Sequence, residues 1–374
     1  MLPLLFACTG ETPSESKSEQ ESQSEQESES SKETEEYVMQ NVDQSMRDAE
    51  NDLLLLGRAY YDGSSLVCDN VGDGIAFRLR FQGELILTAT SDRDSYYTVY
   101  MDGERLSERI CFADGESYAT VAENDDDEIH EIRIVAQNEA QFSLSSLDSI
   151  EFYGTFEEAP VAREYYIEFI GDSLMTGYGN LVPSGTPDVE RSLYQDGTQA
   201  FPFMTAEALG GDCAVVGCSG IGVTSGWRDF NMDVFFPARS YYRDPDTEYT
   251  YTRVPDLVVL SLGTNDVYAP SNAVNMNNSA DVQRLTDGFK ALVAQIGEYY
   301  DTDIPVILLY GMGSPHLDSF APLLMEELGG ESAGMYALKL NPDGSGGNGH
   351  PSLAGHDAAT ETLTEYIREK GLVD

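Results

Sequence analysis

The chain has 374 residues, of which 41% are hydrophobic, so it is long enough to bury the cores of two medium domains and to carry a tail. Its 66 acidic residues against 21 Lys and Arg give a formal net charge of -45 at pH 7. A surface this acidic repels nucleic-acid phosphates and anionic lipid headgroups, which argues against both as partners and leaves neutral polymers such as polysaccharides.

The N-terminal segment has features of an export signal. Apolar residues 4–7 stand directly before Cys8, which is similar to the end of a bacterial lipoprotein signal, where the cysteine is lipidated after cleavage. Only seven residues precede Cys8 and none is Lys or Arg, so an ordinary apolar N-terminus is the alternative. We expect residues 1–8 to be a signal remnant. Cys8 is a candidate membrane tether that would hold the chain outside a bacterial cell or on its surface.

Residues 9–52 are predicted to form a disordered tether. From Glu11 to about Glu36 the sequence consists almost wholly of Ser, Glu, Gln, Lys and Thr, and its one apolar residue is Pro13. Such a segment cannot bury enough apolar surface to offset the entropy that is lost on ordering. The folded part is therefore expected to begin at residue 53.

Residues 53–160 are predicted to form an all-β unit. Apolar side chains alternate with polar or small ones from Ile75 to Phe81 and again from Leu85 to Ala89, which is the period of a half-buried strand. The pair Asp102-Gly103 between two apolar runs is a strong hairpin-turn signal. Several short strands joined by such turns indicate a β-sandwich. His130 lies here among acidic residues and is expected to be a solvated surface histidine.

In residues 161–374 apolar strands alternate with helical patterns, which predicts an α/β fold with a mostly parallel sheet. In such folds ligands bind beyond the carboxyl ends of the strands, and polar motifs follow three of the strands predicted here. The strands are expected at 166–170, 214–217, 257–262 and 304–309, and helices at 201–209, 282–296 and 354–367.

The polar motifs at these strand ends supply what ester hydrolysis requires: a nucleophilic hydroxyl, a base and fixed donors that face an oxyanion. Ser173 supplies the hydroxyl on a tight turn from strand to helix, where Gly171 permits a close turn. Three candidate oxyanion donors follow three strands: the backbone N–H of Ser173, the backbone N–H of Gly220 and the side-chain amide of Asn265.

The base is expected to be a histidine, since no other side chain titrates near neutrality without strong tuning. The chain has four histidines, and His130 belongs to the other unit. His316 lies in a loop after a strand, and His356 lies inside the last predicted helix and is expected to be structural. His350 stands where that helix begins, next to Pro351, which suits a first helical turn. We therefore predict Ser173 and His350 as the catalytic residues.

The order of these motifs resembles the SGNH (GDSL) hydrolase superfamily. Gly171-Asp172-Ser173, Gly220, Gly263-Thr264-Asn265-Asp266 and His350-Pro351 match its four motif blocks in sequence order. Together with segments 57–63, 167–179 and 219–223, they resemble the second family of carbohydrate esterases, which act on acetylated xylan or glucomannan. The resemblance implies a three-layer α/β/α hydrolase with a mostly parallel sheet after a jelly-roll sandwich. It also implies removal of O-acetyl groups from polysaccharide or oligosaccharide, without metal or organic cofactor.

One position departs from the superfamily pattern. An Asp usually stands three residues before the catalytic histidine, and here that place is taken by Gly347. Asp343 is a possible displaced third member, but four glycines separate it from His350 and would let it wander. We therefore expect a Ser–His dyad whose imidazole is steadied by a backbone carbonyl.

Three interpretations remain open at this stage. The first is a polysaccharide acetylesterase, and the second is an esterase of the same fold that acts on a lipid or a small acyl ester. The third is a non-catalytic carbohydrate-binding surface protein. Trp227, the one tryptophan, is a candidate substrate-binding residue, although a lone Trp is more often part of a core. The four cysteines after Cys8 allow three complete disulfide pairings, and Cys213 and Cys218 are too close along one strand to pair easily.

Overall fold

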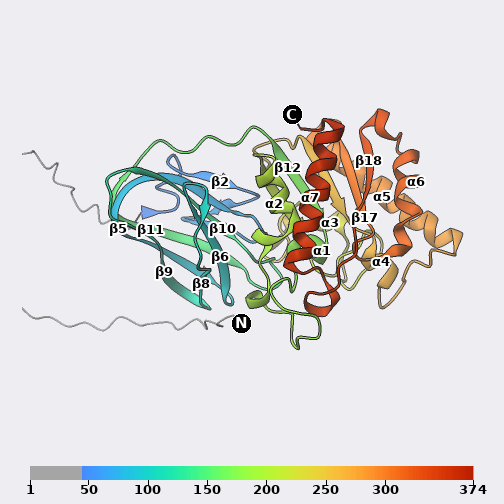
Figure 1. Cartoon of the computed structure of the whole chain (residues 1–374), viewed down its shortest axis with the longest axis horizontal. Coiled ribbons are helices and arrows are strands. Elements are labelled where there is room, and N and C mark those ends of the chain that lie inside the picture. The colour runs from blue at the N-terminus through green and yellow to red at the C-terminus, as the bar shows by residue number, and fades with distance from the viewer. Residues whose placement is uncertain (1–43, 374) are drawn as a thin grey trace, which may run out of the picture.

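The computed structural model describes residues 44–373, which form one large antiparallel sheet and one parallel sheet side by side (Figure 1). The antiparallel sheet has 11 strands. They are β1 (Gln44–Ser45), β2 (Leu54–Leu56), β3 (Tyr60–Asp62), β4 (Ser65–Val67), β5 (Gly74–Ser91), β6 (Ser95–Met101), β7 (Glu104–Arg105), β8 (Ile110–Phe112), β9 (Gly115–Asn124), β10 (Ile129–Ala136) and β11 (Ser145–Phe156).

The long strand β5 organises this sheet, because it pairs with β2, β9, β10 and β11. The two alternating runs predicted for this region are therefore one strand of 18 residues. Its inward side chains are fully buried and pack with those of the neighbouring strands, which is what the two-residue period predicts. These buried side chains are Ile75, Phe77, Leu79, Phe81, Leu85, Leu87 and Ala89.

The folded part begins before the boundary expected at residue 53. Gln44–Ser45 pairs with β11, and the side chains of Met46 and Ala49 are 0% and 1% exposed in the core of the antiparallel sheet. Residues 44–52 thus belong to the folded unit, because these two apolar side chains are buried in its core although their sequence neighbours are polar. Cys8 and the rest of the expected tether lie outside the described residues.

The second unit contains a five-stranded sheet whose neighbouring strands are all parallel, in the order β13-β12-β16-β17-β18. Its strands are β12 (Tyr166–Gly171), β13 (Asp212–Gly217), β16 (Leu257–Ser261), β17 (Val306–Tyr310) and β18 (Met335–Lys339). A separate hairpin joins β14 (Ala238–Ser240) to β15 (Asp244–Glu248). The helices are α1 (Ser173–Thr176), α2 (Phe201–Ala208), α3 (Met232–Phe235), α4 (Thr264–Tyr268), α5 (Ser279–Tyr300), α6 (Phe320–Glu327) and α7 (Leu353–Lys370), with five short 3-10 segments between them.

Helices cover both faces of the parallel sheet (Figure 1). Val258 and Leu260 of β16 pack with α3, α5 and α6, whereas the alternate residues Leu257 and Val259 pack with α1, α2 and α7. Because both faces are covered, these strands read as continuous apolar runs. The sheet order also places β13 and β16 on either side of β12, so the three motif-bearing strands are neighbours.

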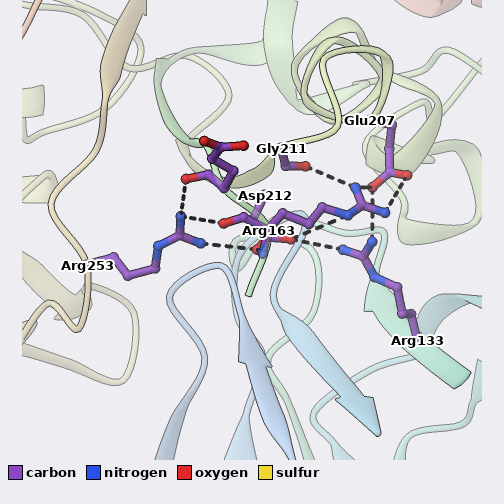
Figure 2. A network of polar contacts seen from close by, with 7 residues as sticks. Arg133, Arg163, Glu207, Gly211, Asp212 and Arg253 are labelled. Carbon is purple, nitrogen blue, oxygen red and sulfur yellow. Dashed lines mark hydrogen bonds and ion pairs between the residues drawn. The ribbon is translucent and has the colours of Figure 1, made fainter. Parts of the chain in front are cut away.

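The two units share an extensive interface. Arg58 of the antiparallel unit is 1% exposed, donates to Glu168 of β12 and to the carbonyl of Phe236, and lies over the Phe236 ring. A second polar network lies at the amino ends of the parallel strands, where Arg133 and Arg253 converge on Asp212 (Figure 2). The carboxyl ends of the same strands lie together at the opposite end of the sheet.

Two further findings concern residues 44–373. Cys68, Cys213 and Cys218 are free and buried, so none of the complete pairings of the four later cysteines is formed. Within this part of the chain, every helix is too short or too polar to cross a bilayer.

Candidate active site

The turn that follows β12 presents Ser173 as the first residue of α1. The side chain of Asp172 caps this helix by accepting a hydrogen bond from the Leu174 N–H at 3.0 Å. Gly171 is required for close approach, since a Cβ there would lie 2.6 Å from the carbonyl oxygen of Ser261. The neighbouring strand and the cap therefore fix the position of Ser173, whose residue exposure is 7%.

His350 meets Ser173 across this edge of the sheet. Its Nε2 lies 2.8 Å from the Ser173 Oγ, although 177 positions separate the two residues in the chain. His350 stands three residues before α7, whose N-cap is Ser352, and the ring of Tyr178 packs 4.4 Å from the imidazole. Burial lowers the pKa of His350 below its usual value, which favours the neutral imidazole that a general base requires.

The other ring nitrogen, Nδ1, is buried and forms no hydrogen bond within residues 44–373. The backbone of Asn348 and Gly347 raises the pKa of the ring and partly opposes the effect of burial. The expected support from a backbone carbonyl is therefore weak, and it does not reach the geometry of an ordinary hydrogen bond.

Gly220 lies directly beyond β13 and has a φ of 86°, which favours glycine. A Cβ here would also lie 3.0 Å from the Cβ of Trp227. Among the hydrogen bonds of the described chain, the backbone N–H groups of Ser173 and Gly220 have no acceptor. Two donors on neighbouring strand ends are thus free to bind an oxygen.

Asn265 occupies the third strand end, but its amide already has partners. Its Nδ2 donates to Asp172 at 3.0 Å and to the carbonyl of Ile221 at 2.9 Å, so both amide hydrogens are engaged. Burial raises the pKa of Asp172 to about 7, and the charges of Asp266 and Glu139 add to this effect. The structure brings Asn265 next to the nucleophile turn, where its amide bonds to Asp172 and Ile221.

Asp343 does not reach His350. Its Oδ2 accepts from the backbone N–H and hydroxyl of Ser352, and its Oδ1 accepts from the same two groups of Ser345. Burial alone would raise the pKa of Asp343, but these hydrogen bonds outweigh it and hold the pKa well below its usual value. The glycine loop is also tied down, since the Gly347 N–H bonds to the Gly179 carbonyl at 2.9 Å. Asp343 is therefore held in one place, contrary to our expectation, and its carboxylate bonds to Ser345 and Ser352.

The remaining candidates lie in three different environments. Trp227 is 60% exposed beside Gly220, so it is not a core residue. His356 is fully buried and accepts from the Phe201 N–H, as expected for a structural residue. His316 contacts the ring of Tyr268. His130 is less solvated than expected, because its ring bonds to two acidic side chains, Asp102 and Asp126.

One residue at this site was missed by sequence reasoning. Glu139 comes from the segment between β10 and β11, is 1% exposed, and binds Ser219 next to Gly220. The local signal was weak: three polar residues, Gln137, Asn138 and Glu139, directly follow a buried strand. Polar residues after a strand usually indicate a surface turn, and nothing local marks these three as buried.

A site for a metal ion would need converging ligands. Among residues 44–373, no group of three or more His, Cys, Asp or Glu side chains is arranged to hold one.

Comparison with known proteins gives this geometry a context. Residues 59–160 match the family model described as carbohydrate esterase 2 N-terminal. The cellulase/esterase CelE of Acetivibrio thermocellus is 26% identical over 316 residues, which cover 79% of this chain and 37% of that protein. An acetylxylan esterase / glucomannan deacetylase of Cellvibrio japonicus is 32% identical over 155 residues, which cover 40% of this chain and 42% of the relative. The chain spans less than half the length of these curated relatives.

A solved structure extends the likeness to the second unit. An acetyl xylan esterase from the rumen bacterium Butyrivibrio proteoclasticus has the same fold, with a TM-score of 0.76 at 19% identity. The match covers 87% of this chain and 96% of that one. The chain resembles the second family of carbohydrate esterases. The resemblance predicted from the motifs is thereby confirmed, and the likeness to family-two esterases extends to both units.

Proposed function

We propose that this protein is a serine esterase that removes O-acetyl groups from plant cell-wall polysaccharide, either xylan or glucomannan. The observation that carries the proposal is the 2.8 Å contact between the Ser173 Oγ and the His350 Nε2, beside two backbone N–H groups that have no acceptor among residues 44–373. In fold terms, we propose an SGNH-type three-layer α/β/α unit preceded by a jelly-roll sandwich. The relatives described above, a cellulase/esterase and a deacetylase, support this substrate class.

The proposed reaction begins with attack on the acetyl carbonyl. The Ser173 Oγ bonds to the carbonyl carbon while its proton passes to the neutral Nε2 of His350. The N–H groups of Ser173 and Gly220 donate to the oxyanion, and Asn265 is the third donor if its amide exchanges a bond to Asp172 or to Ile221. His350 then protonates the departing sugar oxygen. Water, activated by the same imidazole, releases acetate from the acyl-serine.

One exposed side chain would hold and orient the substrate chain. Trp227 presents an exposed ring next to Gly220, which suits stacking on the apolar face of a sugar. The net charge of -45 disfavours anionic polymers and tolerates neutral hemicellulose. We also propose that the protein acts outside the cell or on its surface, with Cys8 as a lipid anchor.

The competing candidates make different predictions on two substrates. Acetylated xylan or glucomannan should release acetate, and an aryl butyrate should be a poorer substrate than the matching aryl acetate. Faster turnover of the butyrate, with no acetate from any polymer, would favour an esterase for another acyl chain. Binding to the polymer without turnover of either ester would leave a non-catalytic carbohydrate-binding protein.

A matched variant separates the polymer site from the chemistry. Trp227→Ala removes an exposed ring that packs in no core, so its fold should persist. The variant should raise KM on the polymer and leave turnover of the aryl acetate nearly unchanged. The same KM on the polymer for the wild-type protein and for Trp227→Ala would show that Trp227 does not contact the sugar.

A further inference from the structure

Ser219, which directly precedes Gly220, is held by side chains on both sides. Glu139 accepts two hydrogen bonds from Ser219, one from its N–H to Oε2 at 2.6 Å and one from its hydroxyl to Oε1 at 2.6 Å. On the other side, the Nε of Arg228 donates to the Ser219 carbonyl oxygen at 2.7 Å. Each backbone polar group of Ser219 therefore has a charged partner.

These hydrogen bonds to Ser219 determine the direction of the Gly220 N–H. The Ser219 carbonyl and the Gly220 N–H belong to one planar peptide group, so fixing the oxygen also fixes the direction of the N–H. Gly220 has a φ of 86°, and its own carbonyl accepts from the Trp227 N–H at 2.8 Å. The peptide is thus held on both sides, while its N–H has no acceptor within the described part of the chain.

Glu139 also reaches the nucleophile helix. Its Oε1 accepts from the Thr176 hydroxyl at 3.2 Å, in the helix that begins with Ser173, and from the Gln195 Nε2 at 3.0 Å. Four hydrogen bonds therefore end on a carboxylate that is 1% exposed. Burial raises the pKa of Glu139, and the hydrogen bonds from Ser219 and Thr176 and the charge of Arg228 oppose that rise.

The same segment of the antiparallel unit approaches the base. Three residues after Glu139, the ring of Phe142 packs 5.8 Å from that of Tyr178, which in turn packs 4.4 Å from the imidazole of His350. Residues 139–142 thus contact the surroundings of the oxyanion donor and of the general base. This explains why the two units need a fixed orientation.

We propose that Glu139 of the antiparallel unit is a positioning residue of the active site, which with Arg228 holds Ser219 so that the Gly220 N–H faces the oxyanion. The inference rests on the proposed esterase function. It assigns the antiparallel unit a part in turnover, through the position of the Gly220 N–H.

Glu139→Gln is a sharp test because no amide rotamer can restore the contacts. Oε1 faces the Gln195 Nε2 and Oε2 faces the Ser219 N–H, and neither nitrogen can accept a hydrogen bond. The Gln195 Oε1 already accepts from the Glu139 N–H, which holds the Gln195 amide in this orientation. Either orientation of the new amide therefore places two donors against each other. The substitution preserves volume and shape, so it changes hydrogen bonding more than packing.

Asp212→Asn is the matched control. Asp212 is another largely buried interface carboxylate and lies at the amino end of β13, the strand whose carboxyl end leads to Ser219. It accepts hydrogen bonds from Arg133, Arg163 and Arg253, away from the site (Figure 2). Its loss should loosen the same interface without releasing the Gly220 peptide.

The experiment measures kcat, KM and the unfolding temperature of the full chain on an aryl acetate. We expect Glu139→Gln to lower kcat about 10²-fold with KM changed less than about threefold, as for the loss of an oxyanion donor. We expect Asp212→Asn to lower the unfolding temperature but to keep kcat within about threefold of wild type. An equal fall of kcat in both variants, or none in Glu139→Gln, would overturn the inference.

A second readout tests orientation of the donor directly. Sulfur accepts hydrogen bonds poorly, so a working oxyanion site should hydrolyse the aryl acetate faster than its thiono analogue. This preference should shrink in Glu139→Gln and persist in Asp212→Asn. If Glu139→Gln does not fold, Arg228→Met can replace it, because this variant removes the hydrogen bond to the Ser219 carbonyl. Arg228→Met should also reduce the preference for the aryl acetate over its thiono analogue. An unchanged preference would contradict the inference, whereas a wild-type protein that hydrolyses no ester would overturn the proposed function as well.

Discussion

Asp343 is hydrogen-bonded to Ser352, the second residue after His350, and not to His350 itself. Its Oδ2 accepts from the Ser352 N–H at 2.9 Å and from the hydroxyl at 2.7 Å. Ser352 is the N-cap of α7, so the carboxylate ties the glycine loop to the start of this helix. We therefore expect Asp343 to act on the base only through the backbone that carries it, as a dyad requires.

This arrangement predicts unequal effects of two substitutions. Asp343→Ala should lower kcat less than about tenfold, whereas His350→Ala should be nearly inactive, because only the histidine exchanges a proton with Ser173. Asp343→Ala should also lower the unfolding temperature, since four hydrogen bonds are lost. Turnover of an aryl acetate and thermal unfolding measure both effects. A collapse of kcat in both variants would make Asp343 a third catalytic member.

Asn265→Ala tests the proposed third oxyanion donor. If its amide exchanges a ground-state partner for the oxyanion, kcat should fall about 10²–10³-fold while KM changes little. The measurement is the steady-state kinetics of the aryl acetate. A change confined to KM would show that Asn265 contacts the bound sugar, and a loss of stability with normal kcat would leave it only as a support for Asp172.

The buried His356 should make stability depend on pH. Burial lowers its pKa from 6.5 to about 4, so the unfolded chain binds the proton more tightly than the folded chain. The contribution of the neutral ring is complete above the unfolded pKa and is lost as pH falls from 6.5 to about 4, by about 3 kcal/mol. Asp73 and Asp172, whose pKa values are raised to about 7, change stability in the opposite direction. The effect of His356 must therefore be measured as the difference in pH-dependent stability between the wild-type protein and a variant that lacks this histidine.

His356→Gln is that variant, because glutamine can still accept from the Phe201 N–H. Urea unfolding of the wild-type protein and of His356→Gln, each at about pH 7.5 and about pH 4.5, gives the free energy of unfolding of both proteins at both pH values. The wild-type protein should lose more stability than His356→Gln on acidification. Equal losses would mean that His356 does not titrate in this window.

The segment 44–52 should contribute to stability although its composition resembles a tether. Two variants, one beginning at Gln44 and one at Leu53, differ by the buried side chains of Met46 and Ala49 and by the pairing of β1 with β11. Loss of one buried Met side chain alone typically costs about 2–5 kcal/mol. The shorter variant should unfold at a lower urea concentration, and coincident unfolding curves would contradict the burial.

The meeting of the candidate residues at one place could be predicted from the sequence because strand ends converge. Ser173, Gly220 and Asn265 each follow an apolar strand, and parallel strands end at one edge of a sheet. The candidate base, His350, could be found by elimination among four histidines and by its place before a helix. These inferences need only local patterns and general topology.

The rest depended on contacts that local patterns do not encode. Glu139 reaches Ser219 only because the two units dock, and the pair is 80 positions apart in sequence. The direction of Asp343 depends on donors from Ser345 and Ser352, which compete with the imidazole for one carboxylate. The burial of Met46 depends on a core that forms from strands far along the chain. In each case tertiary packing decides among conformations that the sequence leaves open.

Acetate release from acetylated xylan and glucomannan by the wild-type protein and by Ser173→Ala tests the central claim most directly. The wild-type protein should release acetate from at least one of the two polymers. Ser173→Ala should keep less than about a tenth of that rate while unfolding at the same temperature, because it removes the hydroxyl that bonds to the His350 Nε2. Acetate release by the folded variant at more than about a tenth of the wild-type rate would rule out Ser173 as the nucleophile.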